Sequence, residues 1–112
     1  MADEAVATQL RRGVVEYCVL ALLRNDERYG FDLVRTLSEV DGLAVTEGTL
    51  YPLLARLRRD GLVVTSLKES SEGPPRKYYA LTDRGRAQLA AFVTEWSIFR
   101  DGVDRLLKGE HT

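Results

Sequence analysis

Residues 46–68 read TEGTLYPLLARLRRDGLVVTSLK, and this stretch decides the fold. Its leucines recur at the three- and four-residue spacing of one buried helix face. These inward residues are Leu50, Leu53, Leu54 and Leu57. Thr46 suits the cap of this helix, which runs to about Asp60 and is stopped by Gly61. Residues 62–68 are rich in β-branched side chains, so a strand is expected directly after the helix.

The expected strand has a partner further along the chain. A second strand is predicted over residues 76–81, which carry the pair Tyr78-Tyr79. Between the two lies ESSEGPP, residues 69–75, a cluster of turn-forming residues that indicates a hairpin. Residues 43–45 are too few for more than a single strand pairing or an extended connector. If they pair with this hairpin, they form the third strand of a small sheet.

Helical patterns fill the rest of the chain. One helix is expected over residues 6–25, and a second follows Tyr29-Gly30 and ends at Asp41-Gly42. Thr82 caps a last helix that continues to about Lys108. These elements predict a mainly α fold with a small β-sheet (α+β). We expect a winged helix-turn-helix DNA-binding domain over residues 1–82 and an added C-terminal dimerisation helix over 83–112, in one compact unit.

The charge balance at first speaks against nucleic acid. The 112 residues hold 16 Lys+Arg and 17 Asp+Glu, a net charge of -1, and the pI of 5.8 lies well below that of a strongly basic module. The charges are segregated, however. Residues 8–12 carry +2, and residues 46–60 and 68–77 carry +1 each, which leaves -5 for the remainder. This pattern predicts a modestly basic edge on an acidic body.

Other classes of protein are disfavoured. The single Cys18 cannot form an internal disulfide, and Asp3 and Glu4 follow Met1 where a signal peptide would be basic. No apolar run is long enough to span a membrane, so a cytoplasmic chain without a membrane partner is expected. His111, the only histidine, lies near the C-terminus. No phosphate-binding glycine loop is evident, and the carboxylates are scattered among arginines without a paired, desolvated arrangement. We therefore expect no catalytic site, metal, cofactor or enzymatic activity.

Motifs along the chain are specific when they are taken together. They are Tyr29-Gly30, Gly48-Thr49-Leu50-Tyr51-Pro52-Leu53-Leu54, Arg56-Leu57, Asp60-Gly61-Leu62, Arg76-Lys77-Tyr78-Tyr79, and Leu81-Thr82 followed by Gly85. In this order and spacing they resemble the PadR family of bacterial transcriptional regulators over roughly residues 10–90. The short final helix is similar to that of the smaller PadR subfamily. The resemblance implies a homodimeric repressor that binds a palindromic operator and releases it on binding a small effector.

The helix over residues 46–60 supplies the predicted DNA face. On a wheel of about 100° per residue, the side opposite the leucines holds Gly48, Thr49, Pro52, Ala55, Arg56 and Arg59, with Tyr51 and Arg58 at one flank. Thr49 suits a thymine methyl or a base edge, Arg56 or Arg59 suits guanine or phosphate, and Tyr51 suits phosphate. The alternative is an ordinary amphipathic surface helix. Pro52 falls inside the helix if Thr46 is the cap, or in its first turn if Thr49 is.

Three cations flank the predicted hairpin tip. Lys68, Arg76 and Lys77 would lie along the phosphate backbone or enter the minor groove, or they are solvated charges that discourage strand pairing. Arg11 and Arg12 add backbone contacts or face solvent. A winged-helix protein-interaction module without DNA binding is the alternative function. Steep salt dependence of DNA affinity separates the two, because only a DNA-binding protein releases condensed counterions.

The last helix carries a coiled-coil type of seam. Its apolar residues are spaced alternately by three and four: Leu89, Phe92, Trp96, Phe99, Val103 and Leu106. With Val14 and Tyr17 of the first helix they form the predicted dimer interface. The alternative is packing only on the chain's own first helix.

Trp96 is the only tryptophan, and two copies facing each other would offer a platform for a small aromatic or planar effector, with Phe92 and Phe99 as walls. In drug-responsive members of the family that this chain resembles, a tryptophan on this helix has that role. The alternative is that Trp96 is simply part of the dimer core.

Overall fold

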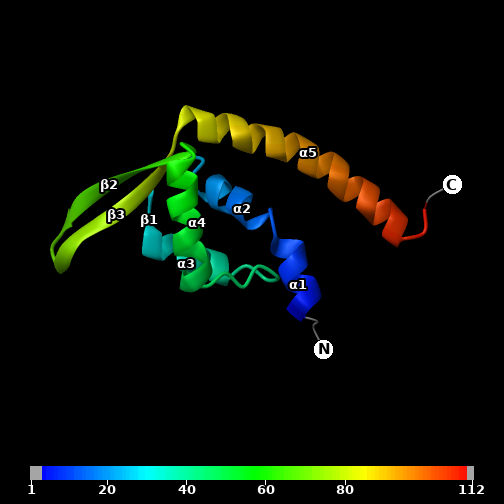
Figure 1. The fold of residues 1–112 in the computed structure, drawn as a ribbon, viewed down its shortest axis with the longest axis horizontal. Coiled ribbons are helices and arrows are strands. Elements are labelled where there is room, and N and C mark those ends of the chain that lie inside the picture. The colour runs from blue at the N-terminus through cyan, green and yellow to red at the C-terminus, as the bar shows by residue number, and fades with distance from the viewer. Residues whose placement is uncertain (1–3, 111–112) are drawn as a thin grey trace.

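The computed structural model describes residues 4–110. In chain order the elements are α1 (Glu4–Arg11), α2 (Val15–Leu22), β1 (Arg28–Tyr29), α3 (Gly30–Ser38), α4 (Glu47–Arg59), β2 (Val63–Ser70), β3 (Gly73–Leu81) and α5 (Asp83–Leu107). Figure 1 shows α2, α3 and α4 at the centre, with the β2–β3 hairpin projecting to one side and α5 to the other. The expectations drawn from Met1, Asp3 and His111 lie outside the described residues.

The three strands form one antiparallel sheet in the order β1-β3-β2. The hairpin pairs Val63 with Leu81 at its base and Ser70 with Gly73 at its tip. Both strands extend further into the tip than the sequence predicted, so the wing is longer than expected. Helices packed beside a small three-stranded sheet confirm the predicted winged helix-turn-helix class.

The third strand is not the one expected. Residues 43–45 form no strand, and β1 takes the place instead by pairing Arg28 with Tyr79 and Tyr29 with Tyr78. Ala44 has a φ of 46°, a left-handed conformation that cannot continue a β-ladder. Val45 is buried in the core rather than set at a sheet edge. The predicted strand pairing of residues 43–45 was therefore wrong, and these residues form a connector between α3 and α4, as in the other alternative.

The expected first helix is two helices. A turn at residues 12–14 separates α1 from α2, and Gly13 has a φ of 81°, which a continuous right-handed helix does not allow. The helical spacing of Leu10, Val14 and Tyr17 conceals this break. The prediction of one helix over residues 6–25 was wrong, and the turn brings α1 beside the connection between α3 and α4.

Helix α4 begins at Glu47, which settles the position of Pro52. Thr46 occupies the N-cap position, although its side chain caps no backbone amide. Pro52 therefore lies inside the helix, where it removes one interior hydrogen bond, as expected if Thr46 rather than Thr49 is the cap. Helix α3 ends at Ser38, earlier than the predicted Asp41-Gly42, although Gly42 does adopt a left-handed φ of 87°.

The core joins the helices to the base of the sheet. Its fully buried side chains are Val19, Leu20, Leu23, Leu33, Leu37, Leu50, Leu54, Leu57 and Val63. The predicted Thr82 cap of α5 is confirmed: the Gly85 amide donates to Thr82 Oγ1 over 2.9 Å, and Thr82 Oγ1 donates to the Gly61 carbonyl over 2.7 Å. A Cβ at Gly85 would clash with the Leu62 carbonyl oxygen. This close approach explains why the position holds glycine rather than the Glu or Gln of a full capping box.

Candidate nucleic-acid interface

Helix α4 has one buried side and one exposed side. Leu50, Leu54 and Leu57 are fully buried, and Leu53 is partly buried against the same core. The exposed residues are Glu47, Gly48, Thr49, Tyr51, Pro52, Ala55, Arg58 and Arg59. The predicted orientation of the helix is thus confirmed. The middle of its outer face is built from small side chains, so the helix backbone itself is accessible.

Tyr51 lies on the flank of α4 that faces the sheet. Its ring and that of Tyr79 both approach Gly30, where an added Cβ would lie 3.3 and 3.2 Å from them. Burial raises the pKa of Tyr51 above its ordinary value, and the Glu47 carboxylate and Tyr29 raise it further. The phenol therefore stays protonated at neutral pH and can donate a hydrogen bond to an anion.

Arg56 lies on the opposite flank and is only partly exposed, whereas Arg58 and Arg59 are exposed. Its Nη2 is 3.3 Å from Oε1 of Glu16 in α2, and its Nη1 is 3.7 Å from Oδ2 of Asp60. The side chain of Glu16 is only 19% exposed. Sequence reasoning missed this partner, although Glu16 is the one charged residue in the apolar stretch from Val14 to Leu23. The guanidinium of Arg56 is thus directed toward α2 rather than straight outward.

The three wing cations do not share one surface. Register places Lys68 opposite Arg76, with Tyr78 on the same face of the sheet. Lys68 Nζ lies 4.8 Å from the ring centroid of Tyr78 and pairs with Glu27, and Arg76 lies 4.9 Å from the ring centroid of Tyr29. Lys77 shares the other face with the buried Tyr79. Lys77 therefore lies on the sheet face that packs on the helices.

Aromatic side chains from α2 and α5 form a continuous row. Tyr17 stacks on Phe92 with centroids 4.1 Å apart and planes 7° apart, and Phe92 stacks on Trp96 at 5.8 Å. Phe99 follows at 6.1 Å from Trp96. Three of these rings, those of Phe92, Trp96 and Phe99, line a groove of about 880 Å³ between α5, the α1–α2 turn and residues 41–43. We call it the aromatic groove. The structure thus brings together all three predicted effector residues.

Most of the chain is similar to proteins of one known family. The family described as Transcriptional regulator PadR-like matches residues 19–91, well over half of the 112 residues. The chain belongs to the PadR family of transcriptional regulators. This membership confirms the resemblance that the sequence motifs indicated, and it covers α3, α4, the wing and the start of α5.

Three relatives illustrate how much of this PadR-family chain is shared, between 72% and 92% of its length. A transcriptional regulator of Mycobacterium tuberculosis is 37% identical over 72% of this chain and 74% of its own. A PadR-like transcription factor of Bacteroides fragilis is 41% identical, with a TM-score of 0.74 over 92% of this chain and 99% of its own. Bacillus subtilis PadR, a negative transcriptional regulator, was solved in complex with operator DNA. That structure is 28% identical, with a TM-score of 0.67 over 72% of this chain and 47% of its own.

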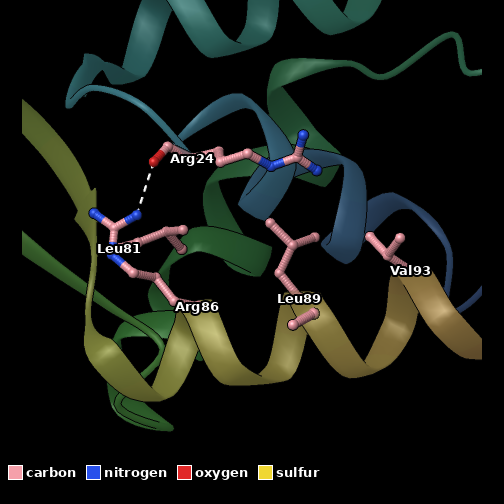
Figure 2. Close-up of a pocket in the computed structure, with 6 residues that line it drawn as sticks. Arg24, Leu81, Arg86, Leu89 and Val93 are labelled. Carbon is pink, nitrogen blue, oxygen red and sulfur yellow. Dashed lines mark hydrogen bonds between the residues drawn. The ribbon is translucent and has the colours of Figure 1, made fainter.

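The first turns of α5 are fixed to the chain's own core. Figure 2 shows Leu81, Leu89 and Val93 lining a hollow of about 440 Å³, where Arg86 Nη1 donates to the Arg24 carbonyl over 2.8 Å. Leu89 is 5% exposed and belongs to the core cluster. It was predicted at the dimer interface, yet almost none of its surface remains for a partner. The predicted row of apolar interface residues on α5 therefore begins in the chain's own core, and only the residues after Leu89 are accessible to a partner.

The second half of α5 has no cover in a single chain. Among the residues that the structure describes, its exposed apolar side chains are Ile98, Phe99, Val103, Leu106 and Leu107. Val14 and Tyr17, predicted at the same interface, are partly buried at the near end of the aromatic groove. An apolar helix face of this length is unusual on a monomer.

Residues 4–110 also bear on membrane, metal and thiol sites. No helix in that range is long and apolar enough to cross a membrane. Nor does that range hold a group of three or more His, Cys, Asp or Glu side chains able to ligate a metal ion. Burial raises the pKa of the Cys18 thiol, which keeps it in its unreactive neutral form at neutral pH.

Proposed function

We propose that this PadR-family chain is a homodimeric cytoplasmic repressor that binds a palindromic operator and is controlled by a small-molecule effector near the dimer interface. One observation carries the proposal. Helix α4 buries its leucines and turns outward a face of small residues with a hydroxyl and an arginine beside them: Gly48, Thr49, Pro52, Ala55 and Arg59. A face of this kind fits the major groove of DNA, where short side chains allow close approach.

Each outward side chain of α4 has a distinct partner in the proposal. Thr49 contacts a thymine methyl or a base edge, and Arg59 reads guanine with its two parallel donors. Tyr51, held neutral by its raised pKa, donates to a phosphate. The guanidinium of Arg56 is paired with two carboxylates, so it is less free to bind a base edge. Arg59 forms no ion pair among residues 4–110, so its guanidinium is available.

The wing gives the second DNA contact. Lys77 faces the same side of the sheet as the helices, whereas Lys68 and Arg76 lie on the other face over aromatic rings. Cations on both faces of a projecting hairpin can follow a phosphate backbone into the minor groove. The structure of Bacillus subtilis PadR with operator DNA supports DNA as the partner, and the description of that protein as a negative regulator supports repression.

The dimer is proposed from the uncovered part of α5. This part of α5 would bury its apolar surface against the same surface of a second copy, mainly through Phe99, Val103 and Leu106. The residues beside them in the interface would be Val14, Tyr17, Phe92 and Trp96, with Leu89 at the inner edge. Such a contact is self-complementary and gives two-fold symmetry. Two α4 helices related by a two-fold axis require a palindromic operator.

The effector is proposed to be a planar aromatic molecule in the aromatic groove. Phe92 and Trp96 already stack nearly parallel, with 17° between their planes, so a flat ligand can extend the row. Charged residues at the rim are balanced: Arg11, Arg12 and Arg100 face Asp41, Glu95 and Asp104. The groove therefore selects for flat apolar surface more than for a net charge.

Titration of labelled DNA from the region upstream of this chain's own gene tests the function. The expected result is preference over a scrambled duplex, with affinity falling steeply between about 50 and 200 mM salt as counterions are released. Equally weak binding to both duplexes at physiological salt would instead support the protein-interaction module. For the effector, planar compounds are expected to quench or shift the emission of Trp96, the only tryptophan.

A further inference from the structure

A second hollow lies between the α1–α2 turn and α4. Its volume is about 350 Å³, and it shares Arg11, Arg12, Gly13 and Leu43 with the aromatic groove. Its polar lining residues are Thr8, Arg11, Arg12, Glu16, Thr49 and Arg56. We call it the arginine cleft. Thr49 belongs both to this cleft and to the outward face of α4, so the cleft continues the proposed DNA surface.

The charges of the two hollows differ. Three guanidinium groups line the arginine cleft against a single carboxylate, that of Glu16, which is already paired with Arg56. The aromatic groove holds equal numbers of arginines and carboxylates. The cleft therefore has an excess of positive charge, and two threonines supply hydroxyl donors. This combination suits the oxygens of a phosphodiester.

The arginines are held in place by different elements. Arg11 Nε donates to the Gly42 carbonyl over 3.1 Å, which ties α1 to the connection before α4. Arg56 is held toward the cleft by Glu16. The side chain of Arg12 is exposed and has no hydrogen bond or ion pair to any residue from 4 to 110, so it is free to bind a ligand. One guanidinium is thus available and two are prepositioned beside it.

We propose that the arginine cleft binds the sugar-phosphate backbone of the DNA strand that runs past the flank of α4 facing the α1–α2 turn. Arg12 and Arg56 contact phosphate oxygens, and Thr49 joins this contact to the base-reading face. Glu16 is a positioning residue that holds Arg56 at the cleft rather than over the bases. The proposal rests on the proposed function, because it assigns one further contact to the same DNA complex.

The test replaces Arg12 by Gln and measures affinity for the upstream duplex and for a scrambled duplex at several salt concentrations. Loss of a phosphate contact weakens both duplexes by the same factor, about fivefold at 0.15 M salt for each copy of Arg12 engaged. The slope of log affinity against log salt becomes shallower by about 0.9 for each such contact. Arg24→Gln is the matched control, because Arg24 is an exposed arginine just beyond the opposite end of α2, and it should leave the slope unchanged.

Three results would overturn the assignment. The first is a wild-type slope for Arg12→Gln, and the second is an equal change in Arg24→Gln, which would indicate only a general effect of net charge. The third is a loss confined to the upstream duplex, which would make Arg12 a base contact. Failure of the wild-type chain to prefer the upstream duplex would instead contradict the proposed function. Thermal unfolding of Arg12→Gln should match that of wild type, since the side chain supports no other residue.

Discussion

Helices α4 and α5 both carry an apolar stripe, but only the stripe of α4 is covered by its own chain. Leu50, Leu54 and Leu57 of α4 are 0% exposed, whereas Phe99 and Leu106 of α5 are 63% and 62% exposed. The remaining face of α4 is polar and built from small residues. Helix α5 keeps an exposed apolar stripe from about Trp96 onward, beside charged residues.

The difference indicates two kinds of partner. The apolar face of α4 is already buried in its own chain, so its exposed polar face is available to a highly charged surface such as DNA. The apolar stripe of α5 is left uncovered in a single chain, and exposing apolar surface to water is unfavourable in free energy. A symmetric second copy would cover it. We therefore propose that α4 recognises DNA and that α5 joins two copies of the chain.

The largest expected effect is on α4. Leu54→Ala should lower the free energy of unfolding by about 2–5 kcal/mol, because it opens a cavity beneath a fully buried side chain. Chemical denaturation measures this loss. Leu106→Ala is the counterpart on α5, and it should lower stability only at protein concentrations where two copies associate. A loss below about 1 kcal/mol for Leu54→Ala would contradict the packing of α4.

The next effect concerns assembly. Phe99→Lys should yield monomers by sedimentation and weaken binding to the upstream duplex by about 100-fold, because two half-sites are no longer bound by one particle. Ile98→Lys is a matched control: it is equally exposed but lies about 100° around the helix and outside the aromatic groove. Dissociation by Ile98→Lys alone would place the interface on the other face of α5.

A smaller effect separates base reading from phosphate binding. Arg59→Gln should cost about 1–3 kcal/mol on the upstream duplex and much less on a scrambled duplex, since a guanine contact is lost. Lys77→Gln should weaken both duplexes alike. Competition titrations with the two duplexes give the comparison. Equal losses on both duplexes for Arg59→Gln would remove it from the base-reading face.

The smallest effects concern two glycines on opposite sides of the aromatic groove. An added Cβ would contact nothing within 4 Å at either Gly13 or Gly102, so only the backbone decides the outcome. Gly13→Ala should destabilise by about 1 kcal/mol because of its positive φ. Gly102→Ala, inside α5, should stabilise by about 0.5–1 kcal/mol. Thermal unfolding distinguishes the signs, and a stabilising Gly13→Ala would mean that α1 and α2 are continuous.

Both comparison helices were largely predictable from sequence. Apolar residues recur in α4 and α5 at helical spacing, and Thr46 and Thr82 precede their first turns, so predicted and observed bounds agree within about one residue. The outward face of α4 followed from the same periodicity.

The remaining features depend on contacts between distant residues. Strand β1 has two residues, too few to show a period, and it exists because Tyr29 pairs with Tyr78. Glycine is tolerated inside helices, so Gly13 alone did not reveal a turn. Arg56 meets Glu16 across 40 positions in the chain, which no local pattern encodes. The inner position of Leu89 likewise depends on how α5 packs over α2.

Footprinting of the DNA upstream of this chain's own gene tests the central division of labour most directly. Two α4 helices joined through α5 should protect two half-sites related by two-fold symmetry, about 10 base pairs or a multiple of that distance apart. Phe99→Lys should abolish both protected half-sites at the concentration where wild type protects them. Protection of a single unpaired site, or unchanged protection by Phe99→Lys, would contradict the account.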